Sequence, residues 1–232
     1  MRKVTILNET TKYPITLMGE RAGVCWGGDI QDQTKNYKRG LECFESEHGR
    51  VLEYVNVEMV IEGYSARVIR EWYTHIGGGP TRLQASTRYI NYSNFDYIMP
   101  NSVKKNEKAQ KHYDMCMNEI KKQIGILINE CDIPREDAAL LLPLGMETKN
   151  VDKRNLRNLL DMSRQRLCNR ANWEYRALMI DIMNELKKLS EEWEYIIDNY
   201  FEPKCKQIGY CTEKKSCGML PKRGESIEGR SK

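Results

Sequence analysis

The hydrophobic pattern of residues 52–76 constrains the fold more than any other feature of this 232-residue chain. Apolar and polar residues alternate over residues 52–63, which is the period of a half-buried strand. From Ser65 the period becomes helical, with one apolar face made by Ile69, Trp72, Tyr73 and Ile76. Three glycines follow at 77–79, and we expect the helix to end there. A strand that runs directly into a short helix indicates an α+β fold.

The remaining patterns place short strands early in the chain and helices toward its end. We predict strands or extended segments at 3–8 and 86–98, helices at 35–47, 103–131, 155–168 and 171–200, and a loop or strand at 144–152. Asp132 is expected to cap a further helix with Pro134 in its first turn. The prediction is one α+β domain over residues 1–203, with a mixed or antiparallel sheet and a helix-rich second half. A basic, cysteine-containing tail follows at 204–232.

Composition excludes several classes of protein. The net charge is +4, and 40% of the residues are hydrophobic. A charge this small permits an anionic small molecule as ligand but argues against binding of nucleic acid. No segment has the apolar length of a membrane span, and the N-terminal sequence MRKVTILNETT lacks the apolar core of a signal peptide. We therefore expect a cytoplasmic protein without membrane or nucleic-acid partners.

The eight cysteines fall into two groups. Five are scattered through predicted secondary structure, as is typical of reduced thiols in a cytosol: Cys25, Cys43, Cys116, Cys131 and Cys168. Cys205, Cys211 and Cys217 are evenly spaced in the tail. Three thiolates can hold zinc, but the usual ligand spacing is tighter, and neither a fourth ligand nor a nearby histidine is evident. We predict reduced, redox-labile thiols and no metal site, with a zinc site as the alternative.

The segment that follows the glycines has the chemistry of an anion site. In an extended strand Ser86 and Arg88 point to one side, where a hydroxyl and a guanidinium suit a phosphate or carboxylate. The glycines at 77–79 would let backbone amides approach the same anion. The alternative is a solvated strand face beside a flexible loop.

The predicted helix from residue 155 offers a second candidate. Asn155, Leu159, Met162 and Arg166 fall on one face, which puts Asn155 and Arg166 about 17 Å apart. This distance suits the two ends of one large ligand, or two adjacent ligands, although arginines are also frequent on solvated helix faces. The chain has no phosphate-binding loop, dinucleotide fingerprint, zinc-protease motif or serine-hydrolase motif. Spacing alone thus predicts an anion-binding α+β domain.

Six stretches in register resemble the flavin-dependent thymidylate synthases, over residues 20–195. They are AGVCW at 22–26, HGRVLEY at 48–54, IREWYTH at 69–75, QASTRY at 84–89, PREDAALLLP at 134–143 and NLRNLLDMSRQRLCNRANWEYR at 155–176. The resemblance implies a homotetramer with shared active sites. It also implies that FAD mediates transfer of a one-carbon unit from methylenetetrahydrofolate to carbon 5 of dUMP, with NADPH as reductant. Such chemistry needs no enzyme nucleophile, because the cofactor carries the difficult step.

The resemblance also assigns expected roles to individual residues. Arg166 matches the arginine that contacts the uracil and favours its N3-deprotonated form, and is the expected catalytic residue. Ser86 and Arg88 match nucleotide-binding residues, and Gln84 stands beside them at a position expected to serve both nucleotide and flavin.

Three further residues match flavin contacts: His75, Asn155 and Arg157. His75 corresponds to the central histidine of the family's Arg-His-Arg signature. Asn155 and Arg157 would lie on opposite sides of a regular helix, so we expect the helix to begin only after Arg157.

The chain departs from the family pattern where cations are usual. Thr74 and Ile76 replace the arginines that flank the signature histidine, and Ala139 replaces an arginine that helps to hold the nucleotide. Arg50, Arg70, Arg82 or the glycine amides are candidates to compensate. Two alternatives to an enzyme acting on dUMP or a related pyrimidine nucleotide follow. One is a catalytically silent homologue that binds nucleotide or flavin or serves in assembly; the other is a redox flavoprotein without folate chemistry.

Overall fold

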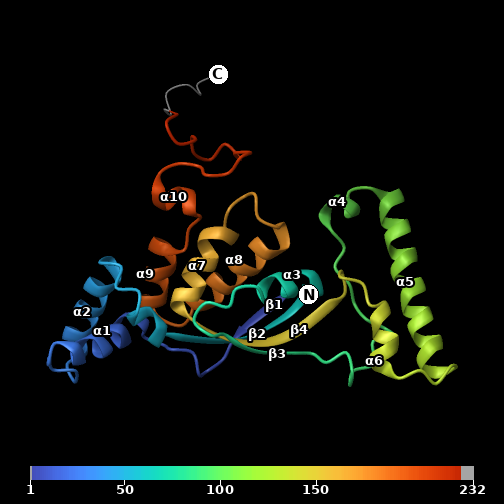
Figure 1. Cartoon of the computed structure of the whole chain (residues 1–232), viewed down its shortest axis with the longest axis horizontal. Helices are drawn as coiled ribbons and strands as arrows, with labels where there is room; N and C mark the ends of the chain where they lie inside the picture. Colours follow the sequence, from blue (N-terminus) through green and yellow to red (C-terminus); the bar gives the residue numbers. More distant parts are fainter. Residues whose placement is uncertain (1, 226–232) are drawn as a thin grey trace. The chain divides into compact units, whose positions relative to one another are not determined.

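A computed structural model describes residues 2–225 of the chain (Figure 1). Its strands are β1 (Lys3–Ile6), β2 (Asn56–Ser65), β3 (Thr81–Gln84) and β4 (Glu147–Asn155). Its longer helices are α1 (Pro14–Cys25), α2 (Gln33–Glu45), α3 (Ala66–Trp72), α5 (Glu107–Asn129), α7 (Leu156–Arg166), α8 (Trp173–Lys187) and α9 (Glu191–Tyr200). Short helical turns are η1 (Val51–Tyr54), α4 (Asn101–Lys104), α6 (Arg135–Ala138), η2 (Ala139–Leu141) and α10 (Lys204–Ile208).

The strands form one four-stranded sheet in the order β1-β2-β4-β3. Just beyond β1, the Leu7 amide donates to the Glu58 carbonyl and the Thr11 amide to the Asn56 carbonyl, so the chain there runs antiparallel to β2. The predicted α+β class, with a sheet and a helix-rich second half, is confirmed. Within residues 2–225, none of the helices combines the length and the apolar run needed to cross a membrane.

The chain divides into two compact units. Of the described residues, unit 1 contains 2–3, Val60–Thr74 and Arg82–Val151; unit 2 contains Val4–Met59, His75–Thr81 and 152–225. The predicted division into a domain at 1–203 and a tail at 204–232 stays a prediction, and residues 226–232 of that tail lie outside the described part.

Unit 2 holds most of the helices. In it α1 and α2 lie side by side (Figure 1), and glycines bring their backbones close together. A Cβ atom on Gly19 would lie only 1.7 Å from the Asn36 carbonyl oxygen, so no larger residue fits there. The Glu192 carboxylate accepts hydrogen bonds from the amides of Ile15 (2.6 Å) and Thr16 (3.0 Å), which ties α9 to the first turn of α1.

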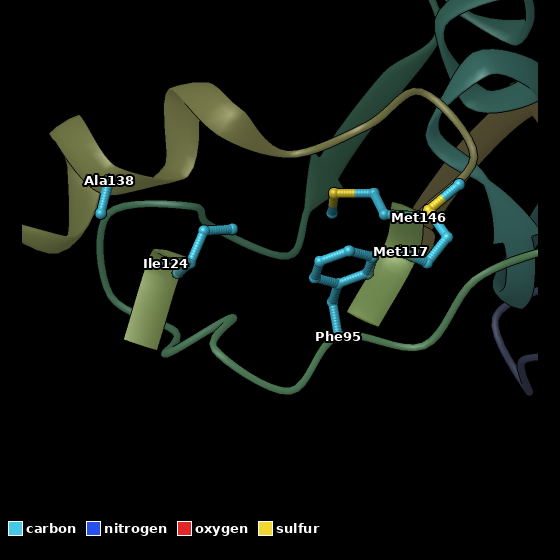
Figure 2. Packing of buried hydrophobic residues seen from close by; sticks show 5 residues of the cluster. All are labelled: Phe95, Met117, Ile124, Ala138 and Met146. Atoms are coloured by element: carbon cyan, nitrogen blue, oxygen red, sulfur yellow. The ribbon is translucent and has the colours of Figure 1, made fainter. Parts of the chain in front are cut away.

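Unit 1 contains the long helix α5 and its own apolar cluster. Figure 2 shows the buried members of this cluster, which are Phe95, Met117, Ile124, Ala138 and Met146. They come from α5, the adjoining turn α6 and the segments before and after them. The apolar face predicted for residues 103–131 therefore packs into this local core, through Met117 and Ile124.

Several predicted elements differ from the structure. The helix expected from Ser65 begins as predicted, with the Ser65 hydroxyl accepting from the Val68 amide at 3.2 Å, but it ends at Trp72. Ile76 is 69% exposed rather than part of its apolar face. The single helix expected at 171–200 is two helices, because Ser190 is extended and caps α9.

Further differences are local. Asp132 does not cap a helix; it takes a left-handed conformation (φ 54°) after α5, which aspartate tolerates, and the next helix begins at Arg135. The segment 86–98 is not an extended strand, since residues 87–89 form a turn. The loop or strand expected at 144–152 contains the start of strand β4.

Candidate active site

The centre of the candidate site is a contact between His75 and Arg166. Arg166 is the last residue of α7, and its Nε donates to Nε2 of His75 at 3.1 Å. The guanidinium carbon of Arg166 lies 4.5 Å from the ring centroid of Tyr175, on α8, and the rings of His75 and Tyr175 are 6.1 Å apart. The sequence separates His75 from Arg166 by 91 positions, and the fold brings them together.

His75 is neutral at physiological pH in this arrangement. Burial, and then the charges of Arg166 and Arg154, lower the pKa of His75 to about 4. A neutral imidazole leaves Nε2 free to accept from Arg166, as the hydrogen bond requires. His75 can therefore hold a guanidinium without adding a second positive charge.

The beginning of α7 is fixed by Asn155. Its Oδ1 accepts from the Asn158 amide at 2.9 Å, so Asn155 is the N-cap and the helix begins at Leu156. The expectation that the helix begins only after Arg157 is wrong. Because Asn155 has extended backbone geometry and Arg157 lies within the helix, the helical period does not fix the direction of the Asn155 side chain relative to that of Arg157.

The glycine loop, residues 77–79, packs on this helix terminus. The Asn155 Nδ2 lies 3.5 Å from the carbonyl oxygen of Gly78. Gly78 has a φ of +73°, and a Cβ atom there would lie 2.2 Å from Asn155 Nδ2. The glycine thus allows a backbone approach that no other residue could make.

Arg157 lines a cavity of about 260 Å³ in unit 2, together with Gly49, Leu52, Asp161 and Arg164. Its Nη1 donates to Oε1 of Glu53 at 2.6 Å, and its side chain is half exposed. The remaining guanidinium nitrogens are oriented by this ion pair and can bind an anion.

Gln84, Ser86 and Arg88 all belong to unit 1. Gln84, in β3, donates to the Thr148 hydroxyl at 3.2 Å. The expectation that Ser86 and Arg88 face one side of a strand is wrong, because the Ser86 hydroxyl accepts from the Arg88 amide at 3.2 Å and the chain turns there. Arg88 Nε donates to Oε2 of the exposed Glu136 at 2.5 Å. The guanidinium is thereby held at the surface by a group that a ligand anion could replace.

The positions that lack the family's arginines carry no substitute charge themselves. The Thr74 hydroxyl donates to the Glu71 carbonyl at 2.7 Å, Ile76 is exposed, and Ala139 begins η2. Of the residues expected to compensate, Arg82 stacks on Tyr73, with its guanidinium carbon 4.2 Å from the ring centroid.

Sequence patterns did not single out the buried pair Asp152–Arg154. Both side chains are fully buried at the end of β4, and Arg154 makes two hydrogen bonds to the Asp152 carboxylate, of 2.5 and 2.7 Å. The signal was present: residues 148, 150, 152 and 154 are polar at alternate positions, which places four polar side chains on the buried face of one strand.

A second cavity of unit 2, of about 280 Å³, lies between the end of α7 and the tail. Four cysteines line it (Cys168, Cys205, Cys211 and Cys217), as do four cations (Arg164, Arg166, Arg170 and Lys204). All eight cysteines are free thiols. Among residues 2–225, no three histidine, cysteine or acidic side chains are grouped so that they could hold a metal ion.

Residues 7–190 match the family model of the thymidylate synthase complementing proteins. The chain belongs to the flavin-dependent thymidylate synthase family. It is 29% identical over 210 residues to the flavin-dependent thymidylate synthase of Nitratidesulfovibrio vulgaris, covering 85% of this chain and 83% of that protein. It is 32% identical over 171 residues to the enzyme of Pyrococcus horikoshii, covering 72% of this chain and 69% of that protein.

Solved structures share the fold of this chain. The flavin-dependent thymidylate synthase of Helicobacter pylori, complexed with FAD and dUMP, superimposes with a TM-score of 0.68 at 18% identity, over 85% of this chain and 99% of that one. A UMP/dUMP methylase of Streptomyces cacaoi, bound with 5-Br dUMP, gives a TM-score of 0.69 at 15% identity, over 87% and 96% of the two chains.

Proposed function

We propose that this family member is an enzyme that reductively methylates dUMP, or a related pyrimidine nucleotide, at carbon 5. The observation that carries the proposal is the Arg166–His75 contact, in which a neutral imidazole and the Tyr175 ring hold the guanidinium at the end of α7. Family membership and the known nucleotide ligands of similar structures support the same conclusion.

Arg166 would act on the pyrimidine by electrostatics. A fixed guanidinium next to the uracil favours loss of the N3 proton and stabilises the negative charge that develops on the ring. Because His75 is neutral, it accepts a hydrogen bond from Arg166 without competing for this anion. The protein supplies orientation and charge, so no enzyme nucleophile is required.

Gln84, Ser86 and Arg88 would bind the nucleotide. Arg88 is paired with the exposed Glu136, and a phosphate would take the place of that carboxylate. A phosphate accepts paired hydrogen bonds from a guanidinium, and the Ser86 hydroxyl could donate a further one.

The residues expected to bind FAD fit such a group. Arg157 has guanidinium nitrogens available beside a cavity, the neutral His75 adds no charge, and Gly78 leaves room for close approach at the Asn155 cap. When bound, FAD would relay a hydride from NADPH and a one-carbon unit from methylenetetrahydrofolate. His75, Gln84, Asn155 and Arg157 would hold it.

We further infer a homotetramer with shared active sites, acting in the cytoplasm. Free thiols at all eight cysteines suit a reducing compartment. Sedimentation or light scattering of the purified protein would test the tetramer.

The visible absorption spectrum of the purified protein, recorded with FAD and then with dUMP, tests the two binding functions. A flavin band whose shape changes on addition of dUMP supports the proposal. A flavin band that is indifferent to dUMP favours another nucleotide or a redox flavoprotein. Absence of flavin binding would favour a catalytically silent homologue, which the loss of charge at Thr74, Ile76 and Ala139 would explain.

A further inference from the structure

The buried end of β4 contains an ion pair, Asp152–Arg154. Arg154 contacts Asn158, and Asn158 in turn contacts the candidate site. The side chains of Asp152 and Arg154 are both 0% exposed, and the carboxylate accepts from two nitrogens of the guanidinium. Arg154 uses a third nitrogen, Nη1, to donate to Oδ1 of Asn158 at 2.5 Å. This bond fixes which end of the Asn158 amide is the acceptor, so the Nδ2 group points to the other side.

That other side faces the glycine loop. A Cβ atom on Gly77 would lie 3.2 Å from Asn158 Nδ2, and one on Gly78 would lie 2.2 Å from Asn155 Nδ2. Asn155 and Asn158 are also joined to each other by the cap hydrogen bond of 2.9 Å. The two amides therefore form the surface on which the glycine loop rests, and the loop begins two residues after His75.

A buried ion pair usually adds little to the stability of a fold. Removing two charges from water is costly in free energy, and well-packed apolar residues of similar volume often stabilise a protein equally well or better. What the pair supplies is a fixed orientation for its third partner. In this fold the third partner is Asn158, at the terminus of the helix whose other end carries Arg166.

We propose that Asp152 and Arg154 are positioning residues, which hold Asn158, the Asn155 cap and the glycine loop in place and thereby set His75 against Arg166. This inference rests on the proposed function. It also accounts for Gly77 and Gly78, which let the loop lie directly on the two asparagine amides.

The charge of Arg154 reaches the site as well. It is one of the two cations that lower the pKa of His75, after burial and Arg166. A buried guanidinium thus contributes electrostatic potential at a site where Thr74 and Ile76 bring none.

The test replaces the pair by apolar residues of similar size, in the double variant Asp152→Leu/Arg154→Met. The matched control is Glu58→Leu/Lys153→Met, which removes the neighbouring ion pair of β2 and β4, of 3.0 Å, whose lysine is half exposed. For both variants the thermal midpoint, the flavin Kd, kcat, KM for dUMP and the NMR titration of His75 are measured.

We expect the Asp152→Leu/Arg154→Met variant to fold, to raise the pKa of His75 toward its ordinary value, and to lower kcat at least tenfold or weaken flavin binding to the same extent. The control variant should leave the pKa of His75, kcat and the flavin Kd unchanged. A double variant with turnover within twofold of the wild type and an unchanged His75 titration would overturn the inference.

Two further outcomes remain decisive. If the double variant does not fold, the nearly isosteric Asp152→Asn replaces it. Because this variant keeps the Arg154 charge, its criteria are kcat, the flavin Kd and the amide exchange of residues 77–79, and not a raised pKa of His75. If the wild-type protein itself forms no methylated nucleotide, the proposed function fails, but the His75 titration and the amide exchange of residues 77–79 still test the positioning role. Both must change in the pair variant and not in the control.

Discussion

Nε of Arg166 and Nε2 of His75 are 3.1 Å apart, and the arginine is the donor. This direction requires an imidazole without a proton on Nε2, which agrees with the pKa of about 4 that burial and the two nearby arginines impose. The pair therefore carries one positive charge rather than two, and that charge lies at the end of α7 on the Tyr175 ring.

Replacing Arg166 should abolish turnover without unfolding the protein. Removing one such charge-stabilising donor typically lowers kcat by about 10²–10³-fold. Arg166→Ala should also raise the pKa of His75, because it removes a neighbouring cation. Rates of methylated nucleotide formation and an NMR titration of His75 check both effects. Arg67→Ala is the control, since Arg67, on α3, has an exposed pairing with Glu71. An active Arg166→Ala variant would contradict the assignment.

The lowered pKa of His75 has a consequence for stability. In the unfolded chain the imidazole binds a proton near its ordinary pKa of 6.5, whereas in the folded chain it does so only near pH 4. Its contribution to stability is therefore fully present above about pH 6.5 and is lost as the pH falls toward 4. The free energy of unfolding, measured by denaturant titration at several pH values between 4 and 6.5, should fall more steeply with decreasing pH for the wild type than for His75→Gln. If the free energy of unfolding depended on pH in the same way for both proteins, the lowered pKa of His75 would be contradicted.

The three glycines should not be equivalent. Both Gly78 and Gly79 have positive φ, so alanine strains the backbone at either position. A Cβ atom on Gly78 additionally collides with Asn155, whereas nothing lies within 4 Å of one on Gly79. We expect Gly78→Ala to cost about 1–3 kcal/mol more than Gly79→Ala, measured by chemical denaturation, because overpacking typically has this cost. Equal losses would show that the loop does not rest on Asn155.

Arg88 should affect nucleotide binding rather than the chemical step. Removing a charged hydrogen-bonding partner costs about 1.5–3 kcal/mol, so Arg88→Ala should raise KM for the nucleotide by about 10- to 100-fold. Glu136→Gln frees the guanidinium and should leave KM unchanged or lower it, with little change in stability because the pair is exposed. A higher KM in Glu136→Gln would show that the ion pair, and not a free Arg88, is the binding form.

Much of this fold could be predicted from local patterns. Period changes correctly located β2, the start of α3 and the long helix α5, because each has one buried face. Boundaries failed where one side chain decides them: Ser190 divides the last long helix, Asn155 caps α7, and a turn at Ser86 replaces a strand. Such choices depend on a hydrogen bond and not on periodicity.

The site was only partly visible in the sequence. Resemblance pointed to His75 and Arg166 separately, but no pattern shows that they touch across 91 positions. The Asp152–Arg154 pair was missed because alternating polar residues predict a solvent-exposed strand face, and only the fold shows that this face is buried. The positioning role proposed for the pair depends on its hydrogen bond to Asn158, which no sequence spacing predicts.

The most direct test of the account is product formation by the purified wild-type protein, supplied with FAD, NADPH, methylenetetrahydrofolate and dUMP. Mass spectrometry of the nucleotide fraction would follow dUMP and its products over time. The account predicts a product heavier than dUMP by one CH₂ unit, formed only when the reductant and the one-carbon donor are both present. A protein that binds flavin and nucleotide, yet leaves dUMP and every related pyrimidine nucleotide unmethylated, would contradict it.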